Sequence, residues 1–274
     1  MNPLALDKIT VRELTHAETA QLAADLGYQA IGLFAYTGDE RRPVEPLMQD
    51  GRAKRELARI LEATGIRIHN LECLILRPET DPNLLKPVLE FGREMGADKA
   101  TAVIYDTDLD RARDTFAQTA RLAGQIGMAV NLEFLPFSPV NSIGEAKRFI
   151  DNIGMPNTGI VVDILHLIRT GGSIAELQSI PADLVRYAQI CDGPEAVESE
   201  RIFHEAVNQR MIPGEGAFPL KEFVEALPAG IEIGIEVPLI DLMEQGIDAR
   251  ERAGRVDRGL RAVLADCNLT GSRQ

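Results

Sequence analysis

Short apolar runs rich in β-branched residues alternate along the whole chain with longer stretches whose apolar positions recur at helical spacing. Strand side chains alternate with a period of two and helical ones with 3.6, so the pattern predicts strands and helices in turn. Several helical stretches end at a glycine, as 52–64 does at Gly65, which is typical of a helix C-terminus. The predicted strands are 9–11, 30–34, 66–71, 99–104, 128–134, 159–163, 185–191 and 231–237, and the predicted helices are 16–26, 52–64, 83–95, 108–125, 142–153, 174–178, 220–226 and 249–266.

Eight strand–helix units imply parallel strands, and the length of 274 residues suits their closure into a barrel, which typically needs about 250. An open doubly wound sheet is the alternative, but its GxGxxG phosphate signature does not follow the first predicted strand. No Pro/Ser linker or shift in composition marks a domain boundary. We therefore predict a single (β/α)₈ TIM-barrel domain over residues 1–274, with its active site at the C-terminal ends of strands five to eight.

The charge balance narrows the class of partner. Lys and Arg number 29 against 42 Asp and Glu, a net charge of −13, which repels phosphate backbones and anionic lipid. The three cysteines are far apart, which argues against a disulfide framework. No signal peptide or membrane-length apolar run occurs in the sequence. We expect a cytoplasmic protein that binds a small molecule, with no nucleic acid or membrane partner, and a homo-oligomer stays open.

The late strands carry polar groups inside apolar runs. Glu133, Asp163 and Glu236 lie among Val, Ile and Leu, and Gln189 is flanked by Ala188 and Ile190. Burying an unpaired carboxylate is costly, so such groups need a cation or an Arg or Lys partner. Mg²⁺ and Mn²⁺ prefer carboxylate and carbonyl oxygen. The residues alone leave two readings open, one divalent metal site or separate salt bridges.

Five short motifs follow one another at these strands, from about residue 128 to residue 238. In this order they resemble the xylose isomerase-like TIM barrels, a family of sugar phosphate isomerases and epimerases related to hydroxypyruvate isomerase, D-tagatose 3-epimerase and inosose dehydratase. The motifs are Asn131-Leu132-Glu133, Asp163-x-x-His166, Gln189-x-x-Asp192-Gly193, Arg210 before Pro213-Gly-x-Gly216, and Ile235-Glu236-Val237.

The resemblance implies an isomerase or epimerase of a small ketose or hydroxy-ketone that forms a cis-enediolate. Glu133 and Glu236 would be its catalytic acid/base pair. His166 and Arg210 would hydrogen-bond substrate oxygens. The implied cofactor is one divalent ion, Mn²⁺ or Mg²⁺ before Co²⁺ or Zn²⁺, and its implied ligands are Glu133, Asp163, Gln189 and Glu236.

Several alternatives remain beside this hypothesis. The same site suits a dehydratase of the inosose or dehydroshikimate type, and a non-catalytic sugar-binding barrel is a less favoured alternative. His69, at the end of the third strand, either lines the pocket as a substrate-binding residue or is a packed strand histidine. Arg210 could instead pair with Glu205, and Asp192 could orient a metal ligand. The long segment from Gly193 to Arg210 could form a lid carrying Glu198, Glu200, Arg201 and His204.

Overall fold

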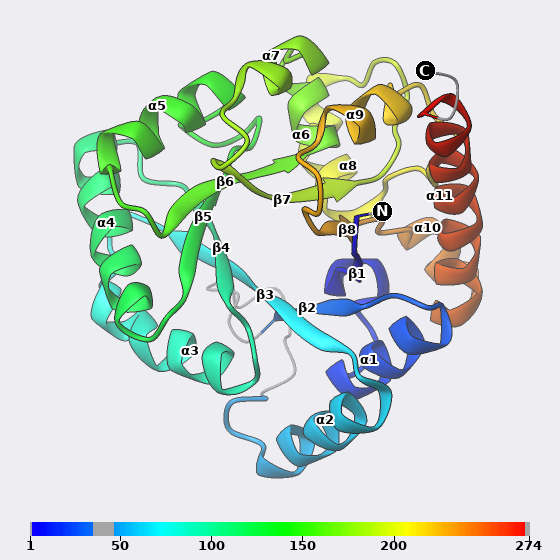
Figure 1. Ribbon diagram of the computed structural model, residues 1–274, viewed down its shortest axis with the longest axis horizontal. Coiled ribbons are helices and arrows are strands. Elements are labelled where there is room, and N and C mark those ends of the chain that lie inside the picture. Colours follow the sequence, from blue (N-terminus) through cyan, green and yellow to red (C-terminus); the bar gives the residue numbers. More distant parts are fainter. Residues whose placement is uncertain (1, 35–46, 272–274) are drawn as a thin grey trace.

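The computed structural model describes residues 2–34 and 47–271, with side chains up to residue 267. Eight parallel strands close into a barrel in sequential order, and the helices surround it (Figure 1). The predicted (β/α)₈ barrel is thus confirmed. The strands are β1 Leu4–Leu6, β2 Ala30–Phe34, β3 Arg67–Leu76, β4 Lys99–Ile104, β5 Ala129–Glu133, β6 Thr158–Asp163, β7 Val185–Ile190 and β8 Ile233–Ile235.

The helices begin and end as their caps dictate. In α1 (His16–Asp25) the Thr15 side chain accepts a hydrogen bond from the Glu18 amide, and the Glu18 carboxylate accepts one from the Thr15 amide. Gly65 ends α2 with φ of 74°, a conformation that a residue with a Cβ rarely adopts. The other helices are α2 Gly51–Thr64, α3 Pro82–Glu94, α4 Leu109–Gln125, α5 Ile143–Ile153, α6 Ile164–Arg169, α7 Ile174–Ser179, α8 Ile202–Asn208, α9 Leu220–Ala226, α10 Ile240–Glu244 and α11 Ala249–Gly271.

The first strand differs from the prediction. Residues 9–11 lie in a 3₁₀ helix, Lys8–Val11, and β1 is the preceding run Leu4–Leu6. The β-branched Thr10 serves the loop instead, because its hydroxyl donates to the Ile235 carbonyl at 2.7 Å and accepts from the Val237 amide at 2.9 Å. The correction matters for the site, since it places Asp7 at the C-terminal end of β1.

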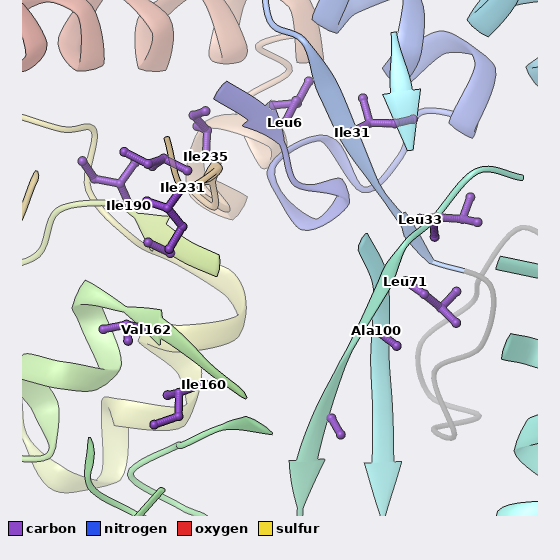
Figure 2. Close-up of a cluster of buried hydrophobic side chains, with 14 of the residues drawn as sticks. Leu6, Ile31, Leu33, Leu71, Ala100, Ile160, Val162, Ile190, Ile231 and Ile235 are labelled. Atoms are coloured by element: carbon purple, nitrogen blue, oxygen red, sulfur yellow. The ribbon is translucent and has the colours of Figure 1, made fainter. Parts of the chain in front are cut away.

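Side-chain alternation separates the apolar layer from the barrel interior. Leu6, Leu71, Val162 and Ile190 belong to an apolar cluster that also includes buried side chains of the surrounding helices, and Figure 2 shows these four residues on their strands. Several of their neighbours toward the strand ends are polar, as Asp163 is beside Val162 and Gln189 is beside Ile190, and point to the other face. The barrel interior therefore carries polar groups toward the C-terminal strand ends. In the described ranges, no helix has the length and apolar character needed to cross a bilayer.

Candidate active site

A cavity of about 190 Å³ lies at the C-terminal ends of the strands. Pockets for drug-sized ligands measure roughly 300–1,000 Å³, so this cavity suits a smaller molecule. Its polar lining includes Glu72, Glu133, His166, Gln189, Arg210 and Glu236, and its apolar lining includes Ile9, Phe34, Ile75, Val103, Phe137 and Phe203. The predicted end of the barrel thus holds a cavity, and five residues singled out in the sequence line it.

Glu133, Asp163 and His166 come together because of how β5 and β6 end. Glu133 is the last residue of β5, and Asp163 ends β6 and caps α6 by accepting the Leu165 amide at 2.7 Å. The first turn of α6 carries His166, whose Nε2 lies 3.5 Å from Glu133 Oε1 and 3.8 Å from Asp163 Oδ2. The Asp-x-x-His spacing therefore places Asp163 at the strand end and His166 one helical turn later, so that both side chains lie close to Glu133.

Arg210 connects two of the predicted metal ligands. Its Nη1 donates to Asp163 Oδ2 at 2.6 Å, and its Nη2 lies 2.7 Å from Glu236 Oε2. The guanidinium is buried, and its Nε donates to the Ala206 carbonyl at 3.0 Å. The suggested pairing with Glu205 does not occur, because Glu205 accepts two bonds from Arg169 at 2.6 and 2.7 Å.

Burial and mutual repulsion set the proton affinities of the cluster. Burial, followed by the charge of Asp163, raises the pKa of Glu133 to about 8. Burial, Asp163 and Glu133 also hold the pKa of Glu236 well above its usual value, although Arg210 opposes this. Burial works in the other direction on His166, where it combines with Arg210 to lower the pKa to about 4. Burial would raise the pKa of Asp163 as well, but Arg210 and His166 outweigh it and the pKa is lowered.

These residues fit a divalent cation. Gln189 donates its amide to Asp7 at 3.1 Å, and its carbonyl oxygen Oε1 is buried with no hydrogen-bond partner among the described residues. Glu133, Asp163 and His166 offer ligand atoms that all lie within 4.8 Å of one another. Carboxylate and carboxamide oxygens suit Mg²⁺ and Mn²⁺, and a set that includes an imidazole also suits Zn²⁺. The carbonyl oxygen of Gln189, the predicted carboxamide ligand, is therefore available to bind a cation.

His69 lies deeper in the barrel than the sequence suggested. Its ring is fully buried, with Nε2 3.5 Å from Asp7 Oδ1 and Nδ1 3.6 Å from Glu232 Oε2. It packs against the Tyr187 ring at 4.6 Å, and it is not among the described residues that line the cavity. His69 is therefore a histidine packed inside the barrel, and in the described structure it lies outside the lining of the cavity where a substrate contact was expected.

Sequence reasoning missed Asp7 altogether. Asp7 is fully buried and accepts bonds from the Tyr187 hydroxyl at 2.6 and 2.7 Å. It was missed because the first strand was placed after it. Leu4-Ala5-Leu6-Asp7 nevertheless shows the same signal as β6, an apolar run that stops on an aspartate.

Residues 20–253 match the family described as xylose isomerase-like TIM barrel. The chain belongs to this family. Among its relatives, the inosose isomerase of Halalkalibacterium halodurans (strain C-125) is 22% identical over 237 residues, which are 80% of this chain and 83% of that protein.

Solved structures of family type superpose over nearly the whole chain. The IolI protein with a bound zinc atom has a TM-score of 0.79 at 19% identity, covering 96% of this chain and 98% of that one. The probable 3-DHS dehydratase AsbF of Bacillus anthracis has a TM-score of 0.73 at 15% identity, covering 92% and 98%. D-allulose 3-epimerase of Methylomonas sp. in complex with D-allulose has a TM-score of 0.71 at 15% identity, covering 95% and 96%. These likenesses show the family fold.

Two family motifs play architectural parts in this barrel. Asp192 does not contact the metal-ligand set in any described interaction; instead it accepts backbone amides of Gly193, Gly214, Gly216 and Phe218 at 2.8 to 3.1 Å. It thereby holds the Pro-Gly-x-Gly loop.

The long segment between β7 and this loop forms α8, which contributes Phe203, Ala206 and Val207 to the cavity wall. The segment is therefore a wall of the cavity. Its charged residues Glu198, Glu200, Arg201 and His204 do not line the cavity in the described structure.

Proposed function

We propose that this chain is a divalent-metal-dependent isomerase or epimerase of a small ketose or hydroxy-ketone, with Glu133 and Glu236 as the acid/base pair. One observation carries the proposal. Two glutamates with largely buried side chains, at the ends of β5 and β8, line one small cavity, and both have raised pKa values. Glu133, with a pKa of about 8, can take up and return a proton near physiological pH. The relationship to an inosose isomerase and to a barrel that binds D-allulose supports a sugar-like substrate.

The chemistry needs a proton moved at a carbon next to a carbonyl. One glutamate removes that proton and leaves an enediolate, and the other delivers a proton to the opposite face or to the neighbouring carbon. Arg210 and His166 line the same cavity, where they would hydrogen-bond substrate oxygens. A divalent ion held by Glu133, Asp163, Gln189 and Glu236 would polarise the carbonyl. Mn²⁺ and Mg²⁺ suit the oxygen ligands, and the zinc of IolI adds Zn²⁺ to the candidates.

The test is hydrogen exchange in D₂O with inosose, D-allulose, D-tagatose and hydroxypyruvate, followed by NMR. We expect deuterium to enter at the carbon next to the carbonyl of at least one compound. Glu133→Gln and Glu236→Gln should each lower conversion by about 10²- to 10⁴-fold, the usual contribution of a positioned acid or base. In an epimerisation, each variant should keep exchange with the one epimer whose C–H faces the remaining glutamate.

The matched control is Glu195→Gln, a glutamate that is exposed and does not line the cavity. It should convert the substrate at the wild-type rate. Wild-type conversion by Glu133→Gln and Glu236→Gln would refute the acid/base assignment. Exchange that is unaffected by removing divalent ions with EDTA would refute the metal requirement.

A dehydratase is the second candidate, and a specific observation favours keeping it. The cavity contains a third carboxyl group, Glu72, whereas moving one proton between two faces needs only two. Elimination of water begins with the same proton abstraction and ends in a conjugated enone or aromatic product. Ultraviolet absorbance that grows with inosose or 3-dehydroshikimate would identify this activity, and its absence alongside isotope exchange would identify an isomerase.

A further inference from the structure

Asp7 contacts a predicted metal ligand, Gln189, across an intervening strand of the barrel. Asp7 follows β1 and Gln189 lies on β7, and β8 separates these two strands. The contact passes over Gly234 of β8, where a Cβ would lie 2.2 Å from Asp7 Oδ2 and 1.7 Å from the Tyr187 hydroxyl. Only a glycine leaves that space open, so the barrel interior is shaped around the contact between Asp7 and β7.

Asp7 determines which way the Gln189 carboxamide faces. Its oxygen Oδ2 accepts a hydrogen bond from the Gln189 side-chain nitrogen at 3.1 Å. A carboxylate only accepts hydrogen bonds, whereas a carboxamide has a donating and an accepting end, so the nitrogen has to face Asp7. The carbonyl oxygen Oε1 is then turned away from Asp7. It is buried, it has no hydrogen-bond partner among the described residues, and it belongs to a side chain that lines the cavity.

Other buried groups hold the Asp7 carboxylate in place. The Tyr187 hydroxyl donates to both of its oxygens at 2.6 and 2.7 Å. Burial, followed by the charge of Asp7, raises the pKa of this hydroxyl well above its usual value, so Tyr187 keeps its proton. His69 Nε2 lies 3.5 Å from Asp7 Oδ1, and its Nδ1 lies 3.6 Å from Glu232 Oε2, which accepts from Lys99 at 2.6 Å. A chain of polar side chains therefore leads from Lys99, at the start of β4, to Asp7.

Glu72 is a further neighbour of Asp7. It belongs to β3 and lines the cavity. Burial, and then the charges of Asp7 and Glu236, hold the pKa of Glu72 well above its usual value, and its hydrogen bond to Asp7 acts in the same direction. Glu72 therefore keeps its proton, and it adds a hydrogen-bond donor to Asp7 instead of a second negative charge.

We propose that Asp7 is a positioning residue, which holds the Gln189 carboxamide with its oxygen toward the divalent ion and thereby raises the affinity of the site for the ion. This inference rests on the metal site of the proposed function and assigns no step of the reaction to Asp7. It gives the buried Tyr187 and His69 a common role, the support of Asp7. Partners that orient a metal ligand typically contribute about 10- to 100-fold to metal affinity.

The test is a double-mutant cycle on Asp7→Ala and Gln189→Ala, with the Kd of Mn²⁺ and of Zn²⁺ measured by calorimetry. Asp7→Ala leaves the Gln189 carboxamide free to face either way, so we expect it to weaken metal binding by about 10- to 100-fold. In protein that already carries Gln189→Ala, Asp7→Ala should cause no further change in Kd, because residues that act through one another are not additive. The Tm in EDTA shows whether each variant is folded.

Two further variants separate the hydrogen bond of Asp7 from its charge. Asp7→Asn keeps one acceptor oxygen for the Gln189 nitrogen, so its Kd should lie between those of wild type and Asp7→Ala. It also takes the place of Asp7→Ala in the cycle if the alanine variant does not fold. The matched control is Glu232→Gln, which removes a carboxylate from the same chain of polar groups but has no described contact with Gln189. It should bind the metal with the wild-type Kd.

The outcomes separate this inference from the proposed function. A wild-type Kd for Asp7→Ala, or an equal loss of affinity with and without Gln189, would overturn the role of Asp7 alone. The same holds if Asp7→Asn or Glu232→Gln binds the metal as weakly as Asp7→Ala, because charge would then account for the effect. Wild-type protein that binds neither Mn²⁺ nor Zn²⁺ would overturn the metal site of the proposed function and this inference together.

Discussion

Removing Arg210 should destabilise the metal-free protein strongly and make it more responsive to divalent ions. The guanidinium is buried between Asp163 and Glu236 at 2.6 and 2.7 Å, with Glu133 close to Asp163. Breaking a buried ion pair by removing one partner costs about 3–5 kcal/mol. Arg210→Leu leaves two carboxylates without their cation, so we expect the upper half of that range in EDTA.

A divalent ion should restore much of this loss. An ion at 100 times its Kd stabilises the folded state by about 2.7 kcal/mol. In wild type the ion competes with Arg210 for Asp163 and Glu236, whereas in Arg210→Leu those oxygens are free of it. The free energy of unfolding can be measured in urea, once with EDTA and once with Mn²⁺ at about 100 times its Kd. The increase caused by Mn²⁺ should be larger for Arg210→Leu than for wild type.

The matched control is Arg169→Leu. The Arg169 side chain is nearly as buried as that of Arg210, at 5% against 2% exposed, and it holds Glu205 through two bonds of 2.6 and 2.7 Å, but Glu205 is not a predicted metal ligand. Its loss should cost a similar free energy in EDTA and show no extra response to Mn²⁺. Equal metal responses in the two arginine variants would refute the reasoning, as would a metal response in wild type that matches Arg210→Leu.

Three further predictions concern pH and packing. The pKa of His166 falls from 6.5 to about 4 on folding, so the unfolded chain binds more protons than the folded one between these pH values. The stability should therefore fall as the pH drops from 6.5 to about 4, and the urea midpoint of His166→Gln should depend less on pH in this range. The pKa of Glu133 rises from 4.5 to about 8, so metal-free protein should lose stability as pH rises over that range, and Mn²⁺ affinity by calorimetry should rise with it. Gly234→Ala would place a Cβ 1.7 Å from the Tyr187 hydroxyl and should cost about 1–3 kcal/mol in urea unfolding. Gly144→Ala in α5, whose Cβ would meet Arg148 Nη1 at an ordinary contact distance of 3.7 Å, should be neutral or stabilising.

The barrel was predictable because each of its signals is local. Glycines at helix ends and apolar alternation depend only on neighbouring residues, and Gly27, Gly65, Gly96 and Gly127 all have positive φ. The strand-end residues Glu133, Asp163, Gln189 and Glu236 were predictable for the same reason. Parallel strands bring their C-terminal ends to one edge, so one rule places all four together.

The remaining features depend on contacts between distant segments. A three-residue strand such as Leu4–Leu6 carries too little periodicity to be separated from the 3₁₀ helix that follows it. The register shift in β3 arises from its pairing with β4, and a strict alternation places Glu72 and Cys73 on opposite faces. The choice of Arg210 between Asp163 and Glu205 was likewise fixed by where α8 packs, which no local pattern contains.

The two readings left open by the sequence, a metal site or separate salt bridges, describe parts of one arrangement. Arg210 does pair with Asp163 and Glu236, yet its single positive charge cannot balance those two carboxylates together with Glu133. The pKa of Glu133 is raised because the group is buried and lacks enough positive charge nearby, so its carboxyl group keeps its proton. A divalent ion together with Arg210 would supply three positive charges to three carboxylates. Arg210 and the proposed metal therefore compete for the oxygens of Asp163 and Glu236, but their charges add up to the balance that the three carboxylates need, and Glu133 is the residue whose protonation should report whether the ion is bound.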